Sequence, residues 1–481
     1  MNRLSCAARL RLLVGFSVNV WLAACSLAPD YEVSAVPIAE QYRATSPWIA
    51  AVPADRISRD DWWTMYDDPQ LDELEVRLLR NNADLQAAFA HYDAARAYVG
   101  EATAGLYPQV TAVVAPQRNR QSDTRPLRAG GPDDYTSVTI GAQINYDVDL
   151  WNRVRDSVTA SKADAQSAQA DFASVQLSLQ AQLAEDYVRL RGFDQQTALL
   201  EQTVDAYAKA VRLTETLHSG GIVTGLDVSR AQTQLASAKS QLEQNVAQRT
   251  SMEHAIAVLV GASASQFTLP RKTSSIGIPV VPVGVPSELL QRRPDIAAAE
   301  RRVAAANARI GVARAAFFPA LTLSAQGGVQ SSAYSAVMSA PSLFWTVGPQ
   351  LAQYIFDGGL RRAQLDEAKA AENEAAARYR GVVLSAFQQV EDGLSQISDL
   401  GTALADQHAA AAAAQRSLDL ALSQYGHGAV GYLDVVQAQT AALESRRSEF
   451  DLQTRQLDAN VQLVRALGGG WLATSPTSRT M

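Results

Sequence analysis

The chain carries the same residue pattern twice, and this internal repeat constrains the fold more than any other feature of the sequence. Residues 82–111 are matched by residues 293–322 at an offset of 211; the matching pairs include Asp84 and Asp295, Tyr107 and Phe318, and Pro108 and Pro319. A second block, 221–233 (GIVTGLDVSRAQT), is matched by 428–440 (GAVGYLDVVQAQT) at an offset of 207. Two matched blocks in the same order indicate a duplicated unit of roughly 200 residues.

Residues 1–24 have the features of a cleaved export signal. Three arginines precede an apolar run that is too short to span a bilayer as a permanent helix. The run ends in Leu-Ala-Ala-Cys, which resembles a bacterial lipobox whose cysteine, here Cys25, is acylated and becomes the mature N-terminus. Ser26 stands where an aspartate would favour inner-membrane retention, so an outer-membrane lipid anchor is expected. An ordinary signal peptide with an incidental cysteine is the alternative.

Composition argues against a nucleic-acid-binding protein and against a protein stabilised by disulfides. The chain has 42 Lys and Arg against 49 Asp and Glu, a net charge of −7, and removal of the three leader arginines makes it −10. An acidic chain without a basic cluster is a poor nucleic-acid binder. Cys6 and Cys25 are its only cysteines, so no pair remains for a disulfide after cleavage, and stability must come from packing or assembly.

Each repeat contains a very long helix and a shorter return helix. Residues 152–217 have no proline and only one glycine, and their apolar residues recur at intervals of three and four, which is coiled-coil spacing. At 1.5 Å per residue such a helix is a rod of roughly 100 Å. The first repeat is expected to continue with a turn at 219–225 and a helix at 226–260. The second repeat is expected to have a helix at 360–425, a turn at 426–432 and a helix at 433–467. A helical hairpin without a specific function is the alternative.

Each repeat also contains a β-hairpin, expected at 108–150 and at 319–356. The clearest strand is 135–150, where apolar residues from Val138 to Leu150 alternate with polar residues, as in a strand with one apolar and one wet face. Pro108 and Pro319 mark the helix-to-strand junctions, because proline cannot continue a helix.

Four strands per chain point to an assembly. No apolar stretch after Cys25 has the length of a membrane-spanning helix, so any membrane crossing must use strands. A membrane barrel needs at least about eight strands, so one chain cannot close it. Three chains would supply about twelve, and two chains are the alternative from geometry. The predicted fold class is an α+β membrane protein, internally duplicated, with a trimeric β-barrel continued by a long α-helical coiled-coil barrel.

The repeats define the expected domain division. A lipidated, extended N-terminal segment (25–60) precedes the first repeat at 61–270. A linker (271–286) leads to the second repeat at 287–470, and a flexible tail follows at 471–481.

Several motifs in the same order resemble those of the outer-membrane factors of the TolC superfamily, in particular the lipidated NodT/OprM branch. They are CSLAPDY at 25–31, WW at 62–63, DPQL at 68–71, NADL at 82–85, RRPDI at 292–296, FFP at 317–319 and ALGGGW at 466–471. The resemblance covers nearly the whole mature chain. It implies a homotrimer in the bacterial outer membrane with a twelve-stranded barrel and a periplasmic tunnel.

The resemblance also implies the function of an exit duct in a tripartite efflux system. Partners would be a periplasmic adaptor protein, an inner-membrane pump, often proton-driven, and outer-membrane lipid. Drugs or other toxic small molecules are the preferred cargo, with protein secretion and metal-ion efflux as alternatives. No enzyme activity is expected, and no cofactor other than the lipid on Cys25.

The two glycine-bearing turns would form the periplasmic tip, where relatives of this family bind their adaptors. The sequence also predicts a purely local role, with the glycines as left-handed helix C-caps and Thr224 and Asp227 as N-terminal caps of the next helix. Charged residues and an aromatic ring near the mouth could hold a closed aperture. The residues assigned to docking and aperture are Gly221, Thr224, Leu226, Asp227, Arg230, Gly428, Tyr432, Leu433 and Asp434.

Other functions find little support. The five histidines are scattered without metal-ligand spacing, and no nucleophile or phosphate-loop motif occurs. A lipid-anchored periplasmic adaptor or coiled-coil scaffold is the alternative from a different class. Such an adaptor has one helical hairpin flanked by small β domains, whereas this sequence has two helical rods alternating with two β-hairpins.

Overall fold

The computed structural model describes residues 27–32, 59–122, 124, 133–279, 281 and 292–469. Cys25, the leader 1–24 and the tail 471–481 therefore lie outside the described residues. The first repeat contributes α3 (Ala83–Ala104), β1 (Gln109–Arg120), β2 (Asp134–Val148), α4 (Arg153–Ser219) and α5 (Gly225–Leu259). The second repeat contributes α7 (Pro294–Ala315), β3 (Ala320–Ser331), β4 (Leu343–Ala352), α8 (Leu360–Gly426) and α9 (Tyr432–Ala466).

Corresponding helices of the two repeats have the same lengths. Helices α3 and α7 each have 22 residues, α4 and α8 each have 67, and α5 and α9 each have 35. The strands differ, because β2 has 15 residues and β4 has 10. The length difference between the repeats thus lies in the hairpins, while the helices keep a common length.

The chain packs as two compact units that do not coincide with the repeats. Of the described residues, the strand unit joins 27–32 with those of 92–168 and 299–379. The helical unit joins the described residues of 59–91, 169–298 and 380–469. Each unit therefore draws on both repeats.

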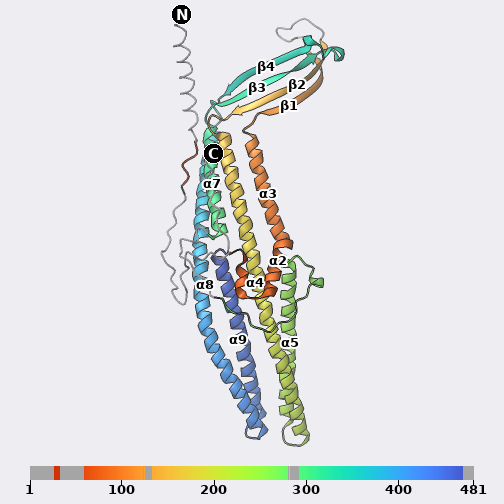
Figure 1. The fold of residues 1–481 in the computed structure, drawn as a ribbon, viewed down its shortest axis with the longest axis vertical. Helices are drawn as coiled ribbons and strands as arrows, with labels where there is room; N and C mark the ends of the chain where they lie inside the picture. The colour runs from red at the N-terminus through yellow and green to blue at the C-terminus, as the bar shows by residue number, and fades with distance from the viewer. Residues whose placement is uncertain are drawn as a thin grey trace. The chain divides into compact units, whose positions relative to one another are not determined.

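In the strand unit, the four strands form one antiparallel sheet in the order β1-β2-β3-β4 (Figure 1). The register places apolar residues of all four strands in one row, for example Val110 opposite Ile144, and Ala325 between Ile144 and Val347. The adjacent row contains Thr111, Gln143, Gln326 and Thr346. The sheet therefore has one apolar and one polar face, as the alternation of residues 135–150 predicts.

The strands end where pairing ends. The sequence predicts that the fourth strand continues to residue 356, but β4 stops at Ala352, which pairs with Ala320. Pro319 precedes that partner and has no N–H to donate, so the ladder cannot be extended. At the end of β2, Asp149 accepts hydrogen bonds from the backbone N–H groups of Val154 and Arg155 at 3.0 and 2.9 Å, which starts α4.

In the helical unit, α2 (Pro69–Asn81) and the short 3-10 segment Arg59–Tyr66 supply the core. They bury Trp62, Trp63, Tyr66, Leu71, Leu74 and Leu78 against apolar residues of α4, α5, α8 and α9. Helix α2 begins with Pro69 after the N-cap Asp68, whose carboxylate accepts the N–H of Gln70 at 3.0 Å. No helix among the described residues combines the length and apolarity needed to cross a bilayer.

A buried ion network fastens the segment after α5 to the helices of this unit. Asp194 accepts hydrogen bonds from Arg191 and Arg249, both at 2.7 Å, and from the backbone N–H of Lys272 at 3.1 Å. Arg249 also donates to the carbonyl of Leu269 at 2.7 Å. Because each buried charge has an opposite charge or a carbonyl beside it, removing one member would leave an uncompensated ion.

Candidate functional site

The turn between α4 and α5 is fixed by a left-handed glycine and a carboxylate. Gly221 has φ +73°, a conformation that side chains disfavour. Asp227 accepts hydrogen bonds from the backbone N–H of Thr224 at 3.2 Å and from its hydroxyl at 2.9 Å. The sequence assigned caps to these residues, and they do terminate one helix and start the next.

The turn between α8 and α9 repeats this geometry with one bond fewer. Gly428 has φ +74°, and Asp434 accepts the backbone N–H of Gly431 at 3.1 Å. Gly431 has no side chain, so the hydroxyl contact made by Thr224 in the first turn has no counterpart. The second turn is therefore held by half of the first turn's capping bonds.

An aromatic cluster joins all four helices behind these turns. Tyr432 is 3% exposed and packs with Val211 of α4, Ala231 of α5 and Val435 of α9. The ring of Tyr425 from α8 meets Tyr432 edge-on at 5.3 Å between centroids. Burial raises the pKa of Tyr432 to about 12, with smaller contributions from Tyr425 and Asp227. Tyr432 is thus a core residue of the turn region within one chain.

Charged and apolar groups share the surface of the turns. Arg230 lies 3.6 Å from the Asp227 carboxylate, one helical turn away and partly exposed, which makes this pair worth at most about 1 kcal/mol. Ile222 is 72% exposed, Leu226 58% and Leu433 45%. Exposed aliphatic residues beside a rigid turn are suited to contact another protein.

The helix-to-strand junctions are built from aromatic residues and prolines in the strand unit. Trp151 stacks on Phe318 with 4.7 Å between ring centroids, and its indole N–H donates to the carbonyl of Pro319 at 2.8 Å. Tyr107, just before Pro108, is exposed. An amphipathic aromatic at a sheet end is typical of a membrane–water interface.

The sequence profile of the outer membrane efflux protein family matches residues 74–262 and 285–469, one match for each repeat. The chain belongs to this family. It is 32% identical over 456 residues to the "Antibiotic efflux pump outer membrane protein ArpC" of Pseudomonas putida, covering 94% of this chain and 93% of the relative. It is 29% identical over 465 residues to the "Cation efflux system protein CusC" of Escherichia coli, covering 95% and 98%.

A solved structure agrees with this assignment. The outer-membrane channel OprN superposes with a TM-score of 0.85 at 30% identity, over 93% of this chain and 100% of that one. The predicted α+β channel fold is confirmed, as is the predicted family. This outer membrane efflux protein is the exit duct of a tripartite efflux system, located in the outer membrane, and it is not an enzyme. The alternative of a periplasmic adaptor is wrong.

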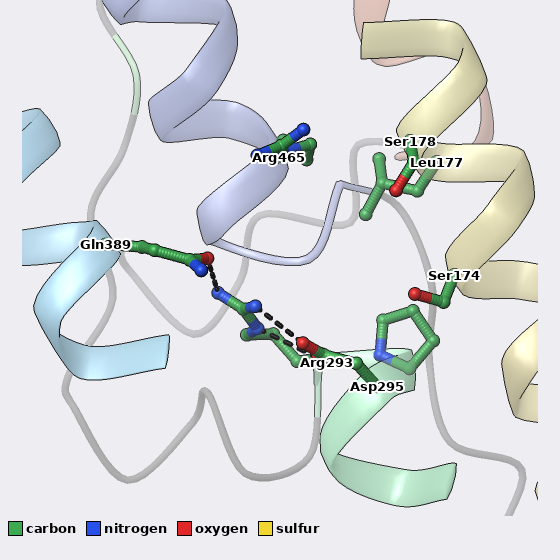
Figure 2. A pocket seen from close by; sticks show the side chains of 8 residues that line it. Ser174, Leu177, Ser178, Arg293, Asp295, Gln389 and Arg465 are labelled. Carbon is green, nitrogen blue, oxygen red and sulfur yellow. Dashed lines mark hydrogen bonds and ion pairs between the residues drawn. The ribbon is translucent and has the colours of Figure 1, made fainter. Parts of the chain in front are cut away.

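In this efflux protein, one residue whose role the sequence did not reveal is Arg293. Figure 2 shows its guanidinium between Asp295 and Gln389. It donates to Asp295 at 3.0 and 2.6 Å, to Gln389 of α8 at 2.9 Å and to the carbonyl of Ala466 in α9 at 3.0 Å. Arg293 therefore ties the start of α7 to two other helices beside a polar cavity of about 200 Å³. The RRPDI motif contains Arg293 and Asp295, but the other two partners, Gln389 and Ala466, lie far away in the sequence.

The helices that flank both turns of the efflux protein meet in the cluster of Val211, Ala231, Tyr432 and Val435. The docking and aperture roles of the turn residues stay predictions. Cys25 lies outside the described residues. Among the described residues, no group of three or more His, Cys, Asp or Glu side chains could hold a metal ion.

Proposed function

We propose that three copies of this chain form one channel that conducts drugs or other toxic small molecules to the exterior. A periplasmic adaptor and a proton-driven inner-membrane pump would deliver them. The observation that carries the trimer is the two-faced sheet, in which β1 and β4 are edge strands and residues such as Val114 and Trp345 expose apolar side chains. Pairing the edges of three copies would remove the unpaired strands and turn one face to lipid.

The polar face of the sheet supports organic small molecules as cargo. At its centre it carries amide and hydroxyl groups, including Gln143, Gln326 and Thr346, and not a ladder of carboxylates or thiolates. Neutral hydrogen-bonding groups interact weakly with many organic solutes and select little by charge. The antibiotic-pump relative favours this cargo, while the cation-efflux relative keeps metal ions as the second candidate.

Deletion of the gene followed by a susceptibility screen tests the cargo. We expect sensitivity to several drugs, restored by the wild-type gene on a plasmid. Sensitivity to metal ions alone would establish the second candidate in its place. Loss of a secreted protein with unchanged drug and metal tolerance would contradict both.

We also propose that the turns dock the adaptor. Ile222→Glu would place a charge in the exposed apolar surface of the first turn, and a central apolar contact contributes about 2 kcal/mol, or roughly 30-fold in affinity. Val258→Glu, on the exposed surface of α5 far along the helix from the turn, is the matched control. We expect only Ile222→Glu to lose complementation while still reaching the outer membrane. Equal behaviour of the two variants would place docking elsewhere.

Finally, we propose that Cys25 carries the lipid anchor. Cys25→Ala is expected to abolish incorporation of radiolabelled palmitate. If label still enters that variant, the lipobox assignment is wrong.

A further inference from the structure

The segment that follows Cys25 is fastened along one face of α7, within the strand unit. Arg314 donates to the carbonyl of Leu27 at 2.9 Å, and Asn307 donates to the carbonyl of Pro29 at 2.9 Å. Tyr31 donates its hydroxyl to the carboxylate of Glu300. We call residues 27–31 the strap. Its contacts recur at helical spacing on α7, so the strap follows a single face of the helix.

A glycine lets the strap approach the helix closely. A Cβ atom at Gly311 would lie 2.8 Å from the Cβ and 2.9 Å from the backbone nitrogen of Ala28. It would also lie within 2.5 Å of the Asp156 carboxylate at the start of α4. Any side chain at position 311 would therefore push the strap off α7. The strap is a fitted contact and not a loosely placed tail.

The direction of the strap determines where its N-terminal end points. Tyr31 lies at the first turns of α7 and Leu27 lies at its last turn, so the chain runs antiparallel to the helix, toward Ala315 and the start of β3. Cys25 precedes Leu27 by two residues, and two residues span at most about 7 Å. A lipid attached to Cys25 would therefore start within two residues of Leu27, which Arg314 binds at the last turn of α7.

A cavity of about 300 Å³ lies at that junction. Its walls include Leu150, Trp151 and Val154 from the first repeat, and Ala315, Phe318 and Leu321 from the second. Val154 is two residues from Asp156 and Ala315 is next to Arg314, so the strap and the cavity share the same ends of α4 and α7. Asp147, Asp149, Arg153 and Arg361 also line the cavity, but its other lining residues are apolar or aromatic, so it suits part of a hydrocarbon chain.

The charges around the cavity are already compensated. Arg153 lies 3.4 Å from Asp147, and Arg361 lies 3.2 Å from Asp357. The Arg361 guanidinium also stacks over the ring of Tyr354 at 4.3 Å. Two arginines that each have a carboxylate partner offer little to the phosphate of a phospholipid headgroup. The chemistry favours an uncharged acyl chain.

We propose that the junction cavity binds an acyl chain of the protein's own lipidated N-terminus, which the strap directs into it. This inference rests on the proposed acylation of Cys25. The lipid would then act as a positioning group, because it pins the strap, α7 and the β2 and β3 ends together at the membrane surface. The contacts of the strap with α7 direct the N-terminal end of the chain toward the cavity, and the apolar walls of the cavity would contact the acyl chain.

The test is photo-crosslinking of the full chain in outer-membrane fractions. Cells are grown with palmitate that carries a diazirine near its methyl end, irradiated, and the purified protein is digested for mass spectrometry. We expect acyl adducts on peptides covering 150–154 and 315–321. The double variant Asn307→Ala, Arg314→Ala releases the strap and should reduce these adducts at least about ten-fold, the effect of a 1.4 kcal/mol loss. Arg309→Ala is the matched control on α7: it removes an exposed ion pair to Asp164 of α4 and should keep the adducts.

Two results would overturn the proposal. Label on Cys25 with adducts only on lipid or on other peptides would show that the chain does not enter the cavity. Equal adducts in the double variant and in Arg309→Ala would show that the strap does not direct it. Absence of label from the wild-type protein would instead refute the acylation, and the inference would fall with it.

Discussion

Glu75 shows how strongly a single residue can be constrained by burial. It lies in α2 with no exposed surface, and neither of its carboxylate oxygens has a hydrogen-bond partner among the described residues. Desolvation raises the pKa of Glu75 well above its ordinary value of 4.5, and Asp72 raises it further. Burial in the folded protein therefore favours the neutral form of this side chain.

Replacing Glu75 with glutamine should make stability less dependent on pH. In the unfolded chain the glutamate ionises above about pH 4.3, so wild-type stability falls by up to about 1.4 kcal/mol per pH unit until the folded pKa is reached. Below the pKa that Glu75 has in the unfolded chain, the carboxyl is protonated in both states and the wild type loses no stability. Glu75→Gln lacks this proton and should be more stable than the wild type at pH 8 but not at pH 4. Denaturant unfolding at both pH values measures this, with the exposed Glu73→Gln as control. Parallel pH profiles for wild type and Glu75→Gln would contradict the burial argument.

Asp227 should stabilise its turn more than Asp434 stabilises the other turn. Asp227 accepts two hydrogen bonds from Thr224 and pairs with Arg230, whereas Asp434 accepts one from Gly431. Loss of a capping side chain costs about 1 kcal/mol. Asp227→Ala should therefore accelerate amide hydrogen exchange at 220–228 more than Asp434→Ala does at 427–435. The reverse order would mean that contacts outside these bonds control the turns.

At the scale of elements, the sequence predicted most of the architecture because the signals are local. Long proline-free runs, alternation from Val138 to Leu150 and the junction prolines are each visible within a few residues of one another. The end of β4 was mispredicted because the apolar residues at 354–356 continue the strand pattern, while pairing ends where Pro319 precedes β3. The role of Arg293 could not be predicted for a related reason, since Gln389 and Ala466 belong to helices far from it in the sequence.

A pair of glycines fixes how closely β2 and β3 approach. Gly141 and Gly328 face each other in the register, and a Cβ at Gly328 would lie 2.5 Å from the Gly141 Cα and closer still to the Ile140 carbonyl. Gly328→Ala should destabilise the sheet by about 1–3 kcal/mol, as overpacking does. Gly348→Ala in β4 meets no atom within 4 Å and serves as control. Heat resistance of the extracted protein on gels is the measurement, and equal loss in both variants would reject the close-contact explanation.

At the scale of the whole molecule, the proposed trimer assigns opposite environments to the two faces of the sheet. The apolar face of the sheet would meet lipid, and the polar face would line the channel. Neighbouring residues of β1 distinguish these environments, because Val114 and Ala115 point to opposite faces. A comparison at these two positions tests the assembly without altering the helices.

Val114→Arg and Ala115→Arg form that comparison. An arginine on the lipid face of a membrane strand costs about 2–4 kcal/mol near the middle of the bilayer, and much less on a water-filled side. If three copies close one barrel as proposed, Val114→Arg should reduce the amount of outer-membrane trimer seen on unheated gels. The free-energy cost of the buried arginine applies to each of the three copies. Ala115→Arg should insert normally and shift the channel toward anions, since three positive charges would face one lumen. Planar-bilayer ion selectivity reports the second effect. Normal insertion of Val114→Arg together with failure of Ala115→Arg would mean that the polar face meets the membrane, and the proposed closure would have to be reversed.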